Sequence, residues 1–465
     1  MSEELNILGS KAPSGVGVLG VGVLYFIGIG GIGMSAIARY YNAKGVKVTG
    51  YDKTSTELTK QLEAEGIEIH YEENIDLIPK EVDLIVYTPA IPVNHSELVY
   101  YRENGYKVVK RSDVLKIITE NSLNICVAGT HGKTTVSTII AHILRHSGFG
   151  CNAFLGGISA NYGTNFWSNE NNVCVIEADE YDRSFLKLSP DIAVITAMDP
   201  DHLDIYGTAA EFEMAFLEFS TKVKESGALI TKHELKKSKE FVSNNHLTYS
   251  YDNAEADVYA SDVKVVNGSY VFDIKSKAWK LSDICLHMGG LHNIENVVAA
   301  VSACKQVGVE DDKIKTAVAD FKGVKRRFEY VLKNDKHVII DDYAHHPEEL
   351  KALITGVRSL FKQKLTMVFQ PHLFSRTKDQ ADGFAEVLNM VDELILLPIY
   401  PARELPMEGV SSDMIIEKMS VKKGRVLSKD AMKEWVKNSR PELVVMAGAG
   451  DIDVQVQHVK ELLES

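Results

Sequence analysis

The sequence predicts an α/β protein made of three domains, each built on a mostly parallel sheet. A chain of 465 residues is longer than one hydrophobic core usually organises. Two segments, residues 21–43 and 124–146, each read as an apolar strand, a glycine-rich loop and a helix. Strands and helices alternate again from residue 337 onward, which is typical of parallel sheets covered by helices.

The first unit is a βαβ segment with a glycine-rich turn. A strand over 21–27 leads into Gly28-Ile29-Gly30-Gly31-Ile32-Gly33 and a helix over 34–43, followed by a strand over 46–50. Asp52 lies 19 residues beyond the last glycine, a spacing typical of dinucleotide-binding folds. The motif leaves three interpretations open: NAD with Asp52 on its ribose, another pyrophosphate such as a UDP-sugar, or a tight turn without a ligand.

Two further strands, 83–87 and 107–110, extend this predicted sheet. They end at the turn Thr88-Pro89-Ala90 and at Arg111, and a helix over 112–119 leads out. Ligands of open α/β sheets bind at the carboxyl ends of the strands, so these residues are candidate contacts.

The second unit opens with the most informative motif of the chain. A strand over 124–128 runs into Gly129-Thr130-His131-Gly132-Lys133-Thr134-Thr135, and a helix is expected over 136–146. Glycines let backbone N–H groups approach phosphates, Lys133 supplies a positive charge, and a threonine hydroxyl can ligate Mg²⁺. Val127 stands where the strict phosphate-loop pattern has glycine, so this is a shorter variant. The alternative is an ordinary turn with a surface lysine, but Gly-Lys-Thr seldom falls at such a junction by chance.

Acidic clusters follow the next two strands: Glu177-Ala178-Asp179-Glu180 after 173–176, and Asp199–Asp204 after 192–196. An acidic residue one βαβ step after a phosphate loop can hold Mg²⁺, directly or through water. We single out Glu177 for this role and interpret Asp179, Glu180 and Asp182 as a solvated acidic turn. His202 is either a hydrogen-bonded turn residue or a contact of the metal or phosphate.

The rest of this unit is predicted to hold a β-hairpin across 258–274, with its turn at Asn267-Gly268, and a helix over 294–306. A linker over 321–328 carries Lys325-Arg326-Arg327. The third unit is then expected to contain strands 337–340, 365–369, 393–397 and 443–446, and helices 347–360 and 379–390.

Histidines of the third unit raise the question of a zinc site. His345-His346 and His372 have no H-x-x-x-H spacing and no cysteine partner, which argues against zinc. A polar substrate pocket fits better, with Tyr343 just before a helix that opens at Pro347. Arg376 could hold a carboxylate through two hydrogen bonds, or be a surface arginine at a helix start.

Composition narrows the class of partner. The net charge of −13 argues against broad nucleic-acid binding, so anionic ligands must meet local positive groups and Mg²⁺. The five cysteines form no CxxC pair, which suggests reduced thiols in a cytoplasmic protein. Residues 15–38 carry no charge, but eight of them are glycine, so a strand with a glycine-rich turn explains them better than a membrane span.

Taken in order, these motifs resemble the muramyl ligases, ATP-dependent amide-forming enzymes of peptidoglycan synthesis. The resemblance covers roughly residues 24–455 and rests on nine separated motifs. They are Tyr25–Met34, Gly129–Thr135, Glu177–Glu180, Asp201–Asp204, His292-Asn293, Arg326–Phe328, Asp341–Pro347, Phe369–His372 with Ser375–Thr377, and Gly448–Asp451.

The resemblance implies a Rossmann-like N-terminal domain (1–120), a central P-loop ATPase-like domain (121–324) and a Rossmann-like C-terminal domain (325–465). The first would bind UDP-N-acetylmuramate through Gly28, Gly30, Gly31, Gly33, Asp52, Thr88, Ala90 and Arg111. The second would bind ATP through Gly129, Thr130, His131, Gly132, Lys133, Thr134, Thr135, Asn293 and Arg327. Mg²⁺ would be held by Thr134, Glu177 and His202.

The third domain would bind the amino acid through Tyr343, His345, His372 and Arg376. Catalysis would fall to Lys133, Glu177, His202, His345 and Arg376. Several family members carry a carbamylated lysine about fifteen residues past the His202-type histidine, but position 217 here is leucine. This departure agrees with the type that adds L-alanine.

The predicted activity is therefore amide formation between UDP-N-acetylmuramate and L-alanine through an acyl phosphate, in a cytoplasmic monomer or homodimer. A recycling ligase that joins the same sugar nucleotide to a tripeptide is the nearest alternative. The first domain alone suggests an NAD-dependent oxidoreductase, and the phosphate loop alone suggests a nucleotide-dependent switch protein.

Overall fold

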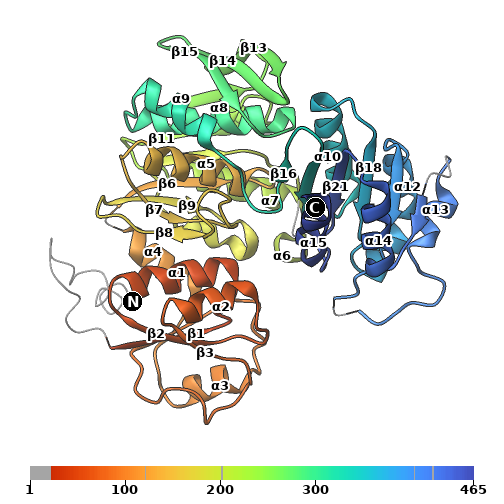
Figure 1. Cartoon of the computed structure of the whole chain (residues 1–465). Coiled ribbons are helices and arrows are strands. Elements are labelled where there is room, and N and C mark those ends of the chain that lie inside the picture. The colour runs from red at the N-terminus through yellow and green to blue at the C-terminus, as the bar shows by residue number, and fades with distance from the viewer. Residues whose placement is uncertain (1–21, 121, 201–202, 403, 421–423, 465) are drawn as a thin grey trace.

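The computed structural model describes residues 22–120, 122–200, 203–402, 404–420 and 424–464. Three sheets follow one another along the chain, of five, ten and six strands, and each has helices packed against it (Figure 1). The α/β fold class with three mostly parallel sheets is confirmed. In Figure 1 the first two units lie one above the other, and the third lies beside the central one.

The first sheet is entirely parallel, with strand order β3-β2-β1-β4-β5. Its elements are β1 (Val23–Ile27), α1 (Ile32–Ala43), β2 (Lys47–Tyr51), α2 (Glu57–Ala64), β3 (Glu68–His70), β4 (Leu84–Tyr87), α3 (Ser96–Glu103) and β5 (Val108–Lys110). Helix α4 (Arg111–Thr119) then leads to the central unit. α1 begins at Ile32, two residues before the predicted start, so the last glycine of the loop lies inside the helix.

The central sheet has the order β15-β14-β13-β12-β11-β10-β6-β9-β7-β8. Its strands are β6 (Leu123–Ala128), β7 (Asn152–Phe154), β8 (Phe166–Trp167), β9 (Val173–Glu177), β10 (Ile192–Ile195), β11 (Ala228–Lys232), β12 (His246–Ser250), β13 (Val258–Val266), β14 (Ser269–Ser276) and β15 (Lys280–Leu286). Its helices are α5 (Lys133–His146), the 3-10 helices η2 (Tyr181–Lys187) and η3 (Ser238–Glu240), α6 (Leu203–Tyr206), α7 (Ala209–Ser220), α8 (Leu291–Gln306) and α9 (Asp311–Asp320).

The predicted hairpin is present as β13 and β14, and β15 adds a third antiparallel strand to it. The strands that carry the motifs, β6, β9 and β10, lie side by side and parallel in the middle of the sheet. Their residues are almost all buried, which explains why they read as short continuous apolar runs. Their carboxyl ends therefore meet at one edge.

The third sheet has the order β16-β17-β21-β18-β19-β20, with only β16 antiparallel. Its strands are β16 (Glu329–Lys333), β17 (Val338–Asp342), β18 (Leu365–Phe369), β19 (Glu393–Leu396), β20 (Gly424–Val426) and β21 (Leu443–Ala447). Its helices are α10 (Pro347–Leu360), α11 (Phe374–Asp379), α12 (Ala381–Leu388), α13 (Asp413–Lys418), α14 (Lys429–Ser439) and α15 (Asp453–Glu464).

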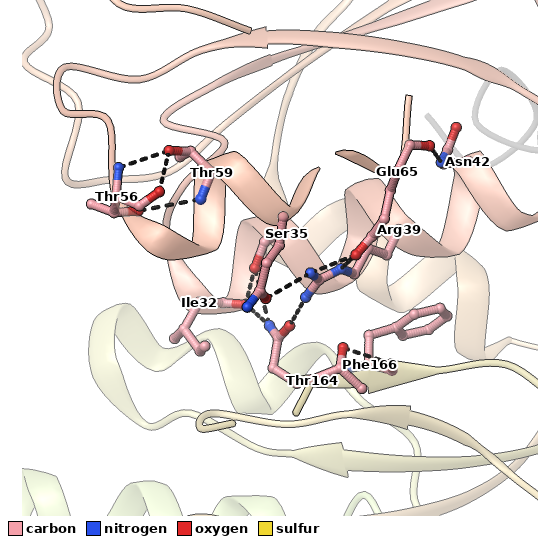
Figure 2. Close-up of polar contacts among 11 residues, drawn as sticks. Ile32, Ser35, Arg39, Asn42, Thr56, Thr59, Glu65, Thr164 and Phe166 are labelled. Atoms are coloured by element: carbon pink, nitrogen blue, oxygen red, sulfur yellow. Dashed lines mark hydrogen bonds and ion pairs between the residues drawn. The ribbon is translucent and has the colours of Figure 1, made fainter. Parts of the chain in front are cut away.

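A buried polar junction joins α1 of the first unit to the β7–β8 segment of the second (Figure 2). Asn165 is fully buried; its side-chain amide donates to the Ile32 carbonyl and the Ser35 hydroxyl, and its Oδ1 accepts from Arg39. Arg39 is 5% exposed and also pairs with Glu65 at 2.7 Å. Every polar atom of the Asn165 side chain is thus bonded, which fixes how the first unit sits on the second.

Within the described ranges, none of the helices has the length and apolar character that crossing a membrane requires. The described part of the uncharged segment, residues 22–38, forms β1, the glycine turn and the start of α1, as the sequence predicted.

Candidate active site

The phosphate loop connects β6 to α5. Gly129 and Gly132 have positive φ angles of 136° and 84°. A Cβ at Gly129 would lie 2.2 Å from the Thr196 hydroxyl oxygen, so the position requires glycine. The Thr130 backbone N–H donates to the Ala197 carbonyl at 3.2 Å, which ties the loop to the end of β10.

Lys133 is the first residue of α5 and points back across the loop. Its Nζ donates to the Gly129 carbonyl and to Oε1 of Glu180, both at 2.7 Å. Glu180 directly precedes η2 and is only 2% exposed, and its carbonyl oxygen accepts a hydrogen bond from the Tyr206 hydroxyl. The interpretation of Glu180 as part of a solvated acidic turn is therefore wrong, whereas the Asp179 side chain is 40% exposed. Burial raises the pKa of Glu180, and the charge of Lys133 opposes that rise.

Glu177 at the end of β9 faces the start of α5. Its Oε1 accepts from the Thr134 hydroxyl at 3.0 Å, and its Oε2 accepts from the Gly156 backbone N–H at 2.9 Å. Burial raises the pKa of Glu177, and nearby Lys133 lowers it. A carboxylate and a hydroxyl that converge in this way suit Mg²⁺, which prefers oxygen ligands and keeps several waters. The predicted third ligand, His202, lies outside the described residues.

The glycine loop of the first unit is bound to the carboxyl end of β2. The Gly28 backbone N–H donates to the Tyr51 carbonyl at 2.8 Å, and the Gly30 N–H donates to Oδ2 of Asp52 at 2.8 Å. Oδ1 of Asp52 accepts from the Thr54 N–H at 3.2 Å. Asp52 therefore fixes the backbone of the glycine loop, and each of its carboxylate oxygens has a further lone pair that can accept a hydrogen bond from a ligand.

The turn after β4 lies against this glycine loop. A Cβ at Gly28 would fall 3.2 Å from the Thr88 methyl carbon, and Ala90 of the same turn is exposed. In the phosphate loop, the predicted contacts His131 and Thr135 differ: His131 is exposed and Thr135 is buried.

Arg111 connects the glycine loop to the central unit. A Cβ at Gly33 would lie 2.3 Å from Nη1 of Arg111, and Nη2 of Arg111 is 3.3 Å from Oδ2 of Asp179. A cavity of about 140 Å³ lies here, and its lining includes Gly33, Arg111, Gly156, Glu177 and Asp179. One cavity thus joins the end of the glycine loop to the predicted metal ligand.

Helix α8 approaches the phosphate loop through Asn296, which was not among the residues predicted from the sequence. Asn293 is buried, donates to the Gly289 carbonyl at 2.6 Å, and accepts from Asn296 at 3.1 Å. Asn296 lies against the loop, since a Cβ at Gly132 would be 3.0 Å from its Oδ1. Asn296 follows the predicted contact Asn293 by three residues and so lies on the same face of the helix, a spacing that could have identified it from the sequence. Arg327, the other predicted ATP contact, is exposed in the linker.

The four predicted amino-acid contacts gather at the carboxyl ends of β17 and β18. The rings of Tyr343 and His345 are 5.4 Å apart, and those of His345 and His372 are 6.1 Å apart. Arg376, in α11, places Nη1 at 3.4 Å from Nδ1 of His372. Burial lowers the pKa of both histidines, and the charge of Arg376 lowers them further, although Glu349 acts in the opposite direction on His345. The neutral imidazoles can therefore accept a proton, and the adjacent guanidinium of Arg376 can bind a carboxylate.

Three family models match consecutive parts of the chain. They are the Mur ligase family catalytic domain over residues 23–122, the Mur ligase middle domain over 127–304, and the Mur ligase glutamate ligase domain over 326–450. The chain belongs to the Mur ligase family. The resemblance that the nine motifs carried is confirmed.

Curated relatives of this Mur ligase match it along nearly its whole length. A UDP-N-acetylmuramate–L-alanine ligase of Flavobacterium johnsoniae is 46% identical, covering 95% of this chain and 97% of the relative. One of Porphyromonas gingivalis is 47% identical, covering 95% and 99%. The solved UDP-N-acetylmuramate–alanine ligase of Thermotoga maritima has a TM-score of 0.80 at 26% identity, with 95% of this Mur ligase and 99% of that chain covered.

Proposed function

We propose that this Mur ligase forms an amide between the carboxylate of UDP-N-acetylmuramate and the amine of L-alanine, at the cost of ATP. Relatives bearing the name of this activity match 95% of the chain at 46–47% identity. The observation that carries the proposal is a cavity lined by Gly33 and Arg111 from the end of the first unit and by Glu177 of the central unit. Because Glu177 also accepts a hydrogen bond from Thr134 of the phosphate loop, we expect the anionic sugar nucleotide to approach the γ-phosphate of ATP at this cavity.

The reaction takes two steps, because a carboxylate is a poor acyl donor. A carboxylate oxygen attacks the γ-phosphorus of ATP, giving an acyl phosphate and ADP. The amine nitrogen of L-alanine then attacks the acyl carbon, phosphate leaves, and the nitrogen loses a proton. Such phosphoryl transfer depends on alignment and charge neutralisation more than on covalent help from the protein.

The first step is assigned to the central domain (121–324). Lys133 exchanges Glu180 for the γ-phosphate, while Gly129–Thr135, Asn293 and Arg327 bind the rest of the nucleotide. Thr134 and Glu177, with His202 from the family resemblance, would hold Mg²⁺, which when bound neutralises phosphate charge. The structural support is the 3.0 Å contact between the Thr134 hydroxyl and Glu177.

The flanking domains supply the two partners of the amide. The first domain (1–120) binds the sugar nucleotide through Gly28, Gly30, Gly31, Gly33, Asp52, Thr88, Ala90 and Arg111. In the third domain (325–465), Arg376 holds the amino-acid carboxylate, His345 accepts the amine proton, and Tyr343 and His372 bound the pocket. The clustering of these four side chains supports the assignment.

The compartment proposed is the cytoplasm, as a monomer or homodimer. All five cysteines are free thiols, four of them buried, which fits a reducing environment.

The decisive experiment measures phosphate release by the purified chain with ATP and UDP-N-acetylmuramate across a panel of acceptors. Release with L-alanine and formation of the corresponding amide are expected. Release only with a tripeptide would assign the recycling reaction instead, and turnover without any amide would remove the ligase assignment.

A further inference from the structure

An arginine of the linker contacts the ring of Tyr343 but has no role in the mechanism above. The Arg326 side chain is 19% exposed, and its guanidinium carbon lies 5.0 Å from the centre of the Tyr343 ring. The Arg326 carbonyl oxygen accepts from the Tyr343 backbone N–H at 2.8 Å. Side chain and backbone of one residue thus hold both the ring and the backbone of Tyr343.

The guanidinium is itself fixed from three directions. Its Nη2 donates to the Gly448 carbonyl, its Nε is 3.6 Å from Oδ2 of Asp341, and its Nη1 is 3.5 Å from Oδ2 of Asp453. The guanidinium thus pairs with one buried carboxylate, since Asp341 is 4% exposed, and with one carboxylate at the surface, since the Asp453 side chain is 46% exposed. A planar guanidinium can make these contacts at its edge while its face stays on an aromatic ring, which lysine cannot do.

The backbone of Arg326 is strained in a way that these contacts explain. Its φ angle is +60°, a left-handed conformation that residues with a side chain rarely adopt. Such strain persists where the surroundings over-determine the position. Phe328, two residues further on, also has a positive φ, and its N–H donates to Asp342 at 2.7 Å, so the linker is bound to the end of β17 at two points.

Tyr343 is the exposed end of the row that binds the amino acid. It is 38% exposed, and its ring meets His345, which in turn meets His372. Its position is therefore free to vary on the outer side unless Arg326 restrains it.

We infer that Arg326 is a positioning residue that holds the Tyr343 ring and thereby limits the size of the amino-acid side chain that this enzyme accepts. The inference rests on the proposed function, in which Tyr343 bounds the side chain of L-alanine. Without the guanidinium face, the ring can swing outward and admit a longer aliphatic side chain.

The test compares L-alanine with L-2-aminobutyrate, which is one methylene longer. One methylene in a closed pocket is usually worth about 10- to 200-fold in kcat/KM. Arg326→Met keeps a long unbranched stem and removes the guanidinium. The ratio of kcat/KM for L-alanine over L-2-aminobutyrate is expected to fall about tenfold, while the KM for ATP stays within about twofold. The matched control is Lys325→Met, which removes a positive charge from the neighbouring exposed residue and should leave the ratio unchanged.

A double mutant separates positioning from a general loosening of the linker. In a Tyr343→Ala background, Arg326→Met should change the ratio no further, because the ring through which it acts is absent. Full additivity, a wild-type ratio in Arg326→Met, or an equal change in Lys325→Met would each overturn the inference. If Arg326→Met does not fold, Arg326→Lys keeps the charge but not the flat face, and a wild-type ratio in that variant would overturn it equally.

The proposed function fails in a different way. It fails if the unmodified chain makes no amide from L-alanine, a result obtained before any variant is compared.

Discussion

Replacing Lys133 by alanine should impair both turnover and stability, and the two effects can be separated. Turnover should fall about 100-fold or more, because a positive charge that neutralises the transferred phosphoryl group is lost. Stability should fall because the same lysine is the ion-pair partner of Glu180 at 2.7 Å.

The size of the stability loss follows from burial. Glu180 is 2% exposed and Lys133 is 14% exposed, so the variant leaves a carboxylate in the interior without its counter-charge. Removing one partner of a buried pair costs about 3–5 kcal/mol. For a domain of 150–250 residues each kcal/mol lowers the melting temperature by about 2–4 °C, so a decrease of at least about 6 °C is expected.

The loss should also depend on pH. Burial raises the pKa of Glu180 above its ordinary value of 4.5, and without Lys133 nothing in the pair opposes that rise. The folded state then binds more protons than the unfolded state, so stability decreases as pH rises through this range. The melting-temperature difference from wild type should be larger at pH 8 than at pH 5.5.

Thermal melts of four proteins test this reasoning. Lys133→Ala/Glu180→Gln should regain most of the stability but none of the activity, because the unpaired charge is gone while the phosphate contact is still missing. Lys187→Ala is the control: its pair with Asp113 is about one-third exposed, and its loss should cost no more than about 1 kcal/mol. A melt of Lys133→Ala within 2 °C of wild type at pH 8, by the scaling above, would refute the assigned role of the buried pair.

Three further outcomes are expected. Glu177→Gln should raise the Mg²⁺ concentration needed for half-maximal activity, since an amide oxygen is a weaker ligand than a carboxylate; an unchanged titration would exclude Glu177 as a ligand. Arg376→Lys should raise the KM for L-alanine, because the lost charged hydrogen bond contributes binding free energy on the order of 2 kcal/mol, while the KM for ATP stays nearly constant. If the KM values for L-alanine and ATP rose together, Arg376 would instead have a role in domain closure. Because burial lowers the pKa of His345, the decrease of kcat/KM for L-alanine on the acid side should be centred below pH 6.5, the ordinary value for histidine; a decrease centred at or above pH 6.5 would contradict the buried imidazole.

The sequence predicted well the parts of the fold that local patterns determine. Helix α10 and strand β18 have the predicted bounds, because Pro347 opens the helix and the strand is one fully buried apolar run. The phosphate loop lies where its glycines indicated, since Gly129 and Gly132 need backbone conformations that other residues avoid. The succession of three mostly parallel sheets along the chain was predicted by the alternation of strands and helices.

Residues whose roles depend on distant segments could not be predicted. Glu180 is buried and its carbonyl oxygen accepts a hydrogen bond from Tyr206, 26 residues later, and no local pattern predicts either feature. The guanidinium of Arg326 donates a hydrogen bond to the carbonyl of Gly448, 122 residues later in the chain. The short strands β7 and β8 were not anticipated, because two or three residues of strand carry too little periodicity to read.

The junction in Figure 2 has a consequence for how this gene can vary over time. Arg39 and Asn165 lie 126 positions apart in the chain, yet each satisfies the other where no water can replace it. Loss of Arg39 would leave Oδ1 of the buried Asn165 without this partner, which costs free energy, whereas Arg39 would keep its pair with Glu65 if Asn165 changed. Recombination near residue 120 would separate residues 39 and 165, so a chimera of two relatives should keep the polar junction only if both residues of this pair are retained.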